Sequence, residues 1–209
     1  MMNEQNSMER LIELYDSAKS CHRCYSDCGI IVPQPDPKNS TGKADILFVL
    51  ERPGRNGAGK TGFISFDNGD PTADFFKECF ELTGLKRQDI FITNSCLCFP
   101  DYEGYNDSKP SDKELKNCQY WFNEVIKMVE PKLIVTIGSA AFESVTNCFH
   151  YKPKTGFLKN IGRLIKDTDP FIYPLGHTSI RGRSPVNRSA ELQKQDWLKL
   201  PLIMNEVKS

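Results

Sequence analysis

Four short, largely apolar runs, separated by segments with helical spacing, constrain the fold more than any other feature of this sequence. The runs cover residues 46–50, 89–94, 132–137 and 171–173. An unbroken apolar run is typical of a strand buried on both faces, and strands that alternate with helices are joined by right-handed crossovers. The sequence therefore predicts an α/β fold, a three-layer α/β/α sandwich around a central four-stranded parallel sheet.

Five segments carry the apolar spacing, caps or stop signals of helices. Ser111 and Glu114 form a capping box, and Gly84 and Pro131 are stop signals. The predicted helices cover residues 4–19, 72–82, 111–129, 140–147 and 189–200. We expect a single domain over residues 1–209, in which the N-terminal helix and loop (1–43) pack on an α/β core (44–209).

In a parallel sheet of this kind, ligands bind at the carboxyl ends of the strands. Those ends carry Glu51 with a glycine-rich loop, then Asn94, Gly138 and His177. Chemistry is therefore expected where these four positions meet.

Charge and hydropathy exclude some classes of protein. Lys+Arg and Asp+Glu balance at 27 each, so no global charge attracts nucleic acid, although a local basic patch remains possible. No apolar run approaches the roughly 20 residues that cross a bilayer, and the N-terminus is polar. We expect a soluble, cytoplasmic monomer that does not bind membranes.

Eight cysteines are many for the intracellular protein that the sequence predicts. A disulfide framework is not expected without a signal peptide, and the C-x-x-C of Cys21 and Cys24 points to metal or redox chemistry. A thioredoxin-like motif would open a helix, whereas this one follows a helix and precedes a proline-rich loop. Metal or cluster ligation is therefore favoured. Cys79 and Cys148 lie in predicted helices and are expected to be small buried apolar residues.

The glycine-rich loop also matches the P-loop pattern, with Gly54 followed by Gly59, Lys60 and Thr61. A P-loop passes directly into a helix, whose N-terminus holds the phosphates. Here residues 62–71 are poor helix formers, and no apolar strand ends in an aspartate that would hold Mg²⁺. A P-loop nucleotide hydrolase is thus the weaker alternative, because only the glycine-rich motif supports it.

Taken in order, the motifs make this chain resemble the iron–sulfur uracil-DNA glycosylases of families 4 and 5. The resemblance covers roughly residues 10 to 200, with every element in the order that these families have. It rests on the C-x-x-C, a G-E-A-P-G-like turn, a T-N-x-x-x-C-x-P-like segment, a cysteine before a P-K-h-I-V-h-h-G strand, and a histidine motif. Here these are Cys21–Cys24, Leu50–Gly54, Thr93–Pro100, Cys118 before Pro131–Gly138, and Gly176–Arg181.

The resemblance implies a 4Fe-4S cluster that ties the N-terminal segment to the core. Its four thiolate ligands would be Cys21, Cys24, Cys98 and Cys118. Zinc bound by the same four thiolates is the alternative, because both metals accept tetrahedral sulfur. Cys96 and Cys28 are spare candidates.

The resemblance also implies a pocket for a base flipped out of DNA. Asn94 would read the base edge with its amide, and Phe63 would stack on the base. Pro53 and Gly54 would bring the backbone close to the base and sugar.

For catalysis, His177 would donate to the base carbonyl where negative charge develops. Glu51 and Asp67 are candidates for positioning the water or stabilising the sugar cation, and Asp70 competes with Asp67. Ser179 and Arg181 would contact DNA phosphates.

The expected activity is that of a monofunctional DNA glycosylase in base-excision repair, which removes uracil or another deaminated base without strand cleavage. A non-catalytic member of the same fold that binds nucleic acid or nucleotide is the alternative. Three positions differ from the family pattern: Leu50 and Arg52 replace small residues, and Thr178 replaces a proline. The long Arg52 side chain is expected either to fill part of the pocket or to reach a phosphate.

Overall fold

A parallel sheet forms the centre of the protein, as the apolar runs predict. The structure, a computed structural model, describes residues 4–39, 42–105 and 107–208. Four parallel strands lie in the order β5-β3-β7-β8. They are β3 (Ile46–Leu50), β5 (Ile90–Asn94), β7 (Leu133–Ile137) and β8 (Phe171–Leu175). Nearly all their side chains are buried, so the sheet is covered on both faces.

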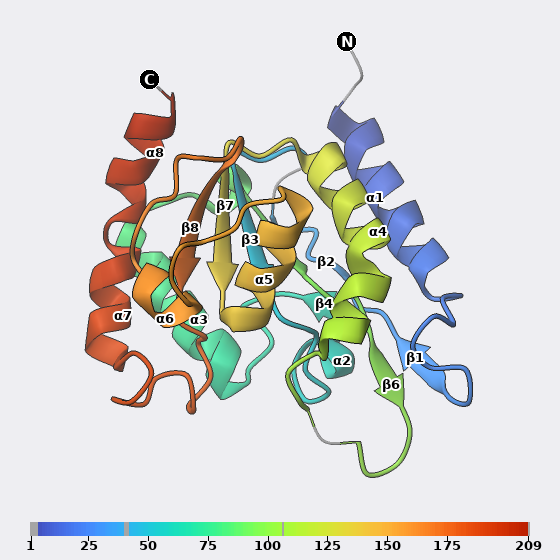
Figure 1. Ribbon diagram of the computed structural model, residues 1–209. Helices are drawn as coiled ribbons and strands as arrows, with labels where there is room; N and C mark the ends of the chain where they lie inside the picture. The colour runs from blue at the N-terminus through green and yellow to red at the C-terminus, as the bar shows by residue number, and fades with distance from the viewer. Residues whose placement is uncertain (1–3, 40–41, 106, 209) are drawn as a thin grey trace.

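Helices cover both faces of the sheet (Figure 1). On one face lie α1 (Glu4–Ala18), α4 (Asp112–Val129) and α5 (Ser139–Cys148), with α5 against β3 and β7. On the other lie α3 (Pro71–Thr83) and α7 (Ala190–Trp197), followed by α8 (Leu200–Lys208). Phe48 of β3 marks this second face, because its ring stacks on Trp197 and meets the edge of Phe76. The α/β/α sandwich is confirmed.

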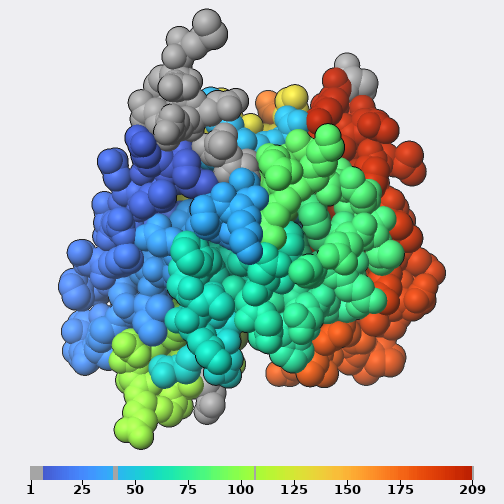
Figure 2. Space-filling model, turned by 180° about the vertical axis from the view of Figure 1, so that it is seen from behind, coloured from blue at the N-terminus to red at the C-terminus, as the bar shows by residue number. Residues whose placement is uncertain are grey.

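Short elements hold the N-terminal segment, which the sequence predicts to be irregular. β1 (Gly29–Ile31) pairs with β6 (Phe99–Asp101), and β2 (Gln34–Pro35) pairs with β4 (Phe63–Ile64). In Figure 2 the N-terminal segment, in blue, lies beside the cyan segment that contains β4. Strand pairing therefore pins this segment independently of any bound metal. Residues 40 and 41 lie outside the described residues.

Local signals place most helix ends correctly. The capping box of Ser111 and Glu114 opens α4, and Asp70 caps α3, which stops at Gly84 with φ 67°. The predicted last helix is instead two helices, α7 and α8, because Pro201 lacks the N–H that would continue the first. β8 also runs on through Pro174, which an edge strand tolerates.

The P-loop match does not produce P-loop geometry. Helix α2 (Ala58–Thr61) is four residues long and ends at Gly62, whose φ is 79°. Strand β4 follows directly, so no extended helix presents its N-terminus to a phosphate. The remaining short elements are α6 (Phe157–Asn160) and a 3₁₀ turn at Arg87–Asp89. Within the described ranges, no helix is long and apolar enough to cross a membrane.

Candidate active site and cysteine cavity

The carboxyl ends of the sheet strands open into a cavity of about 1430 Å³. Loops after β3, β5, β7 and β8 line it, as the rule for parallel sheets predicts. The cavity brings together seven residues singled out in the sequence. These are Glu51, Pro53, Gly54, Asn94, His177, Ser179 and Arg181.

Glu51 and His177 face each other at the floor of this cavity. His177 Nε2 lies 3.9 Å from Glu51 Oε2, and Glu51 Oε1 accepts a hydrogen bond of 3.1 Å from the Ala140 amide at the start of α5. A glycine at position 138 leaves the room in which the Glu51 and His177 side chains come this close. A Cβ at Gly138 would lie 2.6 Å from Glu51 Oε1 and 2.9 Å from His177 Cδ2, and its φ of 96° favours glycine.

The hydrogen bonds of His177 fix its tautomer. Its Nδ1 accepts from the Ser179 amide at 3.1 Å, so the neutral ring carries its hydrogen on Nε2. Burial lowers the pKa of His177, and the charge of Glu51 opposes that shift. The site therefore presents a neutral imidazole N–H beside a carboxylate.

Asn94 supplies an amide with unused bonding capacity. It sits at the end of β5, lines the cavity, and is only 1% exposed. Among the described residues, its Nδ2 has no hydrogen-bond partner. A buried, unpaired donor is costly, so this amide is suited to a ligand that brings its own acceptor.

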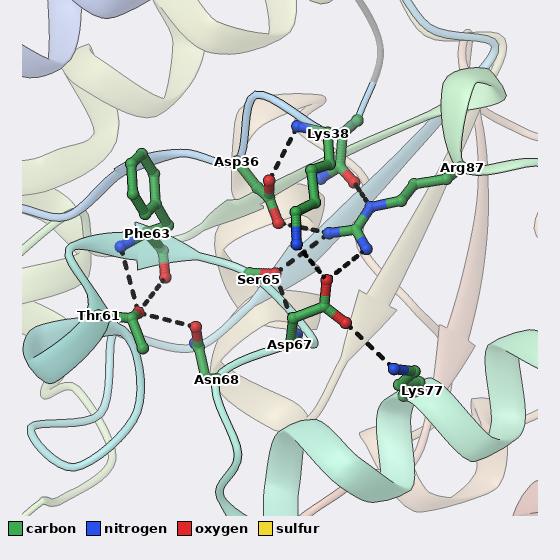
Figure 3. Close-up of polar contacts among 10 residues, drawn as sticks. Asp36, Lys38, Thr61, Phe63, Ser65, Asp67, Asn68, Lys77 and Arg87 are labelled. Atoms are coloured by element: carbon green, nitrogen blue, oxygen red, sulfur yellow. Dashed lines mark hydrogen bonds and ion pairs between the residues drawn. The ribbon is translucent and has the colours of Figure 1, made fainter.

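Asp67 and Phe63, two other candidates, are not among the described residues that line the cavity. Figure 3 shows Asp67 facing three cations: Arg87 at 2.7 Å, Lys38 at 3.2 Å and Lys77 at 3.3 Å. These ion pairs lower the pKa of Asp67 to about 2, against the opposing effect of burial. The Phe63 ring is 41% exposed. Neither residue is brought to Glu51 and His177.

Asp70 does line the cavity, but its carboxylate already has a structural task. Its Oδ1 accepts from the amides of Thr72 and Ala73 as the N-cap of α3. A Cβ at Gly57 would lie 2.3 Å from Asp70 Oδ2, so the glycine-rich loop closes tightly over this cap.

Arg52 borders the large cavity, which agrees with the first of the two expectations, and its guanidinium is engaged inside the protein. Its guanidinium forms an ion pair with Glu114 and donates to Tyr105 Oη at 2.7 Å. The Arg52 side chain is 6% exposed and borders both the large cavity and a second, smaller one. It therefore points into the protein, away from a phosphate at the surface.

The second cavity gathers the predicted metal ligands. Cys21, Cys24, Cys98 and Cys118 all line it, and the spare candidate Cys96 lines it as well. The Asn117 amide donates to Cys24 Sγ at 3.4 Å, and the Leu97 amide donates to Cys118 Sγ at 3.3 Å. N–H donors to sulfur are the usual surroundings of iron–sulfur thiolates.

The surroundings of three cavity thiols, Cys24, Cys98 and Cys118, raise their pKa values. Burial, together with the neighbouring thiols of Cys118, Cys24 and Cys21, raises the pKa of Cys98 to about 12. Side chains fill the space, leaving about 20 Å³ free. Within the described part of the chain, no three His, Cys, Asp or Glu side chains are arranged to hold a metal ion. Any bound metal would therefore require rotation of these thiols.

Besides Arg52 and Arg188, which pair with Glu114 and Asp196, four exposed basic side chains line the large cavity. Lys109, Lys154, Lys159 and Arg181 line it, and only Arg181 was identified from the sequence. Lys109 and Lys154 lie in loops and Lys159 lies in the short helix α6, so no local pattern places them at a strand end. They are recognisable only once the fold brings residues 107–109 and 154–159 together.

Comparison with known proteins is decisive for the family. The model of the family described as the uracil DNA glycosylase superfamily matches residues 37–200. This chain belongs to the uracil DNA glycosylase superfamily.

Its relatives in that superfamily include members of both types that the motifs indicate. A type-4 uracil-DNA glycosylase of Archaeoglobus fulgidus is 28% identical over 146 residues, which is 68% of this chain and 66% of the relative. A type-4 enzyme of Sulfurisphaera tokodaii is 29% identical, over 64% of this chain and 55% of the relative. A type-5 enzyme of Pyrobaculum aerophilum is 26% identical, over 54% and 52%. The chain thus matches about half to two thirds of the length of these relatives.

Proposed function

We propose that this protein is a monofunctional DNA glycosylase that removes uracil or another deaminated base from DNA. The names of the type-4 and type-5 relatives support this activity. The observation that carries it is Asn94, a buried amide whose Nδ2 lacks a partner among the described residues. It lines the same cavity as the Glu51–His177 pair. One amide offers both a donor and an acceptor, which matches the edge of uracil.

In the proposed reaction, water hydrolyses the bond between the base and C1′ of the deoxyribose. The bonding electrons leave with the base, and the water oxygen forms the new bond to C1′. His177 Nε2–H donates to the base carbonyl as negative charge develops there, as donors do in an oxyanion hole. Glu51 favours the cationic sugar by its charge and takes the proton of the attacking water. The product is a free base and an abasic site.

The rim of the cavity suits a DNA backbone. Lys109, Lys154, Lys159 and Arg181 are exposed cations around the mouth, and Ser179 adds a hydroxyl. Such contacts bind phosphates without reading sequence, and they place the flipped nucleotide over the pocket.

The donor set of the cysteine cavity suits a 4Fe-4S cluster as the resident group, once the thiols rotate to receive it. Cys21, Cys24, Cys98 and Cys118 would hold it, with zinc on the same thiolates as the alternative. The cluster would supply cross-linking of the N-terminal segment, β6 and α4, and would take no part in bond cleavage. We further propose a single domain that acts as a cytoplasmic monomer, because the DNA-facing cavity is formed within one chain.

The test is excision from a duplex that carries one uracil, with an all-thymine duplex as control. Purified protein in excess should release free uracil and leave abasic sites that break only after alkali treatment. Asn94→Ala and His177→Ala should abolish most of the release. If the wild-type protein binds the duplex but releases no base even at high excess, the non-catalytic alternative is correct.

A further inference from the structure

One face of α4 forms a wall of the cysteine cavity. Glu114, Asn117, Cys118 and Trp121 all line it, and their spacing of three and four places them on the same side of the helix. Three of them already serve this cavity. Asn117 donates to Cys24 Sγ, Cys118 is a predicted ligand, and Glu114 pairs with Arg52.

Two N–H groups in the lining of this cavity remain unused, one on α4 and one on the loop after β3. Trp121 Nε1 and Arg52 Nε are buried, and neither has a hydrogen-bond partner within the described residues. Both residues line the cysteine cavity. A buried N–H without an acceptor costs about 1–3 kcal/mol, so two of them around one cavity require an explanation.

Sulfur atoms of a bound cluster would supply the missing acceptors. A 4Fe-4S cluster brings bridging sulfides in addition to its four thiolates, whereas a zinc ion brings no acceptor beyond the thiolates. The cluster and its ligands are also anionic overall, and the guanidinium of Arg52 is a buried cation. The orphaned donors therefore fit the cluster better than zinc, whereas the charge fits both, because either group with four thiolates is anionic.

We propose that Trp121 and Arg52 donate hydrogen bonds to sulfur atoms of the cluster and thereby set its stability and its reduction potential. This inference rests on the cluster named in the proposed function. Trp121 and Arg52 are positioning residues: they act on the cluster and touch no substrate. Arg52 is held for this role by Glu114 and Tyr105, which bind the two terminal nitrogens of its guanidinium and leave Nε without a partner among the described residues.

The resemblance to families 4 and 5 does not account for Arg52, because a small residue stands at that place in their motif. The role proposed for Arg52 therefore belongs to this chain. Hydrogen bonds and positive charge both favour the reduced cluster, which carries one more negative charge. Their removal should make the cluster harder to reduce.

The experiment compares Trp121→Phe with Tyr120→Phe in anaerobically purified full-length protein. Each change removes the polar N–H or O–H of an aromatic side chain, and Trp121→Phe also shortens the ring system. Tyr120 is 52% exposed and does not appear among the described residues of the cavity wall. Iron content, the rate of bleaching by a chelator, and the reduction potential are measured. Trp121→Phe should bleach about tenfold faster and should lower the equilibrium constant of reduction about tenfold, which is about 59 mV for one electron. Tyr120→Phe should match the wild type in both.

A second pair separates charge from donation at Arg52. Arg52→Lys keeps the charge and loses Nε, whereas Arg52→Met loses both, so the potential should fall further in the methionine variant. If either arginine variant fails to fold, the tryptophan pair alone decides.

The outcomes distinguish the inference from the proposed cofactor. A wild-type protein that carries iron, with Trp121→Phe unchanged in both bleaching and potential, overturns the donor role and leaves the cluster in place. A wild-type protein that carries zinc and no iron overturns both.

Discussion

Replacement of Asn94 tests the proposed active site most directly, because stability and activity should respond differently. The side chain is buried, but its Nδ2 has no partner among the described residues. Asn94→Ala therefore removes an unsatisfied donor worth about 1–3 kcal/mol of penalty, which offsets the packing that is lost. The side chain also borders an open cavity, so little new void is created. We expect the free energy of unfolding to stay within about 1 kcal/mol of the wild type.

Activity should fall much further. A hydrogen bond to a neutral group contributes about 1 kcal/mol, and one to a group that gains charge contributes about 1.5–3 kcal/mol. A pair of such bonds from Asn94 to the base is worth about 3 kcal/mol, which corresponds to about 150-fold in rate. Asn94→Asp should be slower still, because it removes the donor and adds a charge that repels the departing anion.

The assay is a single-turnover measurement with protein in excess over a uracil-containing duplex, combined with urea unfolding of each variant. Thr136→Val is the matched control. The Thr136 hydroxyl is likewise buried in the sheet without a partner in the described chain, but Thr136 is not among the described residues that line the cavity. This control should keep its rate. A rate for Asn94→Ala within about threefold of the wild type would refute the reasoning, as would a stability loss above about 3 kcal/mol.

Three further predictions follow from the site. Glu51→Gln should lower the single-turnover rate by about 10²-fold with binding of DNA retained, and an unchanged rate would remove Glu51 from the chemistry. His177 has a lowered pKa, so the native state binds its proton only below the ordinary value of 6.5. The free energy of unfolding should therefore decrease as the pH is lowered from 6.5 toward that lower pKa. In urea unfolding, His177→Gln should flatten this dependence of stability on pH, and an unchanged dependence would contradict the assignment. Asp67→Asn should lower the free energy of unfolding by about 1 kcal/mol, because solvent screens its ion pairs, and should change the rate less than about twofold. Asp74→Asn is the exposed control. The contribution of Asp67 to stability is present above its ordinary pKa of 3.8 and is lost as the pH falls toward about 2. A large loss of rate in Asp67→Asn at neutral pH would restore Asp67 as a catalytic candidate.

The sheet and the place of the site were predictable because both depend on local signals and one topological rule. The apolar runs locate β3, β5, β7 and β8, and parallel strands bring their carboxyl ends to one edge. Glu51, Asn94 and His177 then fall together without any knowledge of side-chain contacts.

The partners of individual charged side chains were not predictable in the same way. Asp67 and Glu51 are both carboxylates near glycines, and only the fold shows that Asp67 is held by Lys38, Lys77 and Arg87. The orientation of Arg52 likewise depends on Glu114, which is 62 residues away in the chain. Interactions over such separations leave no local pattern, so sequence reasoning identified the residues but not their roles.

The two cavities share a wall, which would let the proposed cluster affect the proposed base removal. The segment after β5 runs from Asn94 to Cys98 and borders both cavities. Within it, the amide of Cys96 and the hydroxyl of Ser95 both donate to the Glu51 carbonyl, at 3.0 and 2.7 Å. The backbone that carries Glu51 is thus hydrogen-bonded to the segment that carries Cys98. A displacement of about 1 Å at a reacting group costs about 10²-fold in rate. Loss of the proposed cluster should therefore slow the proposed base release by freeing this wall, without removing a group from the proposed reaction.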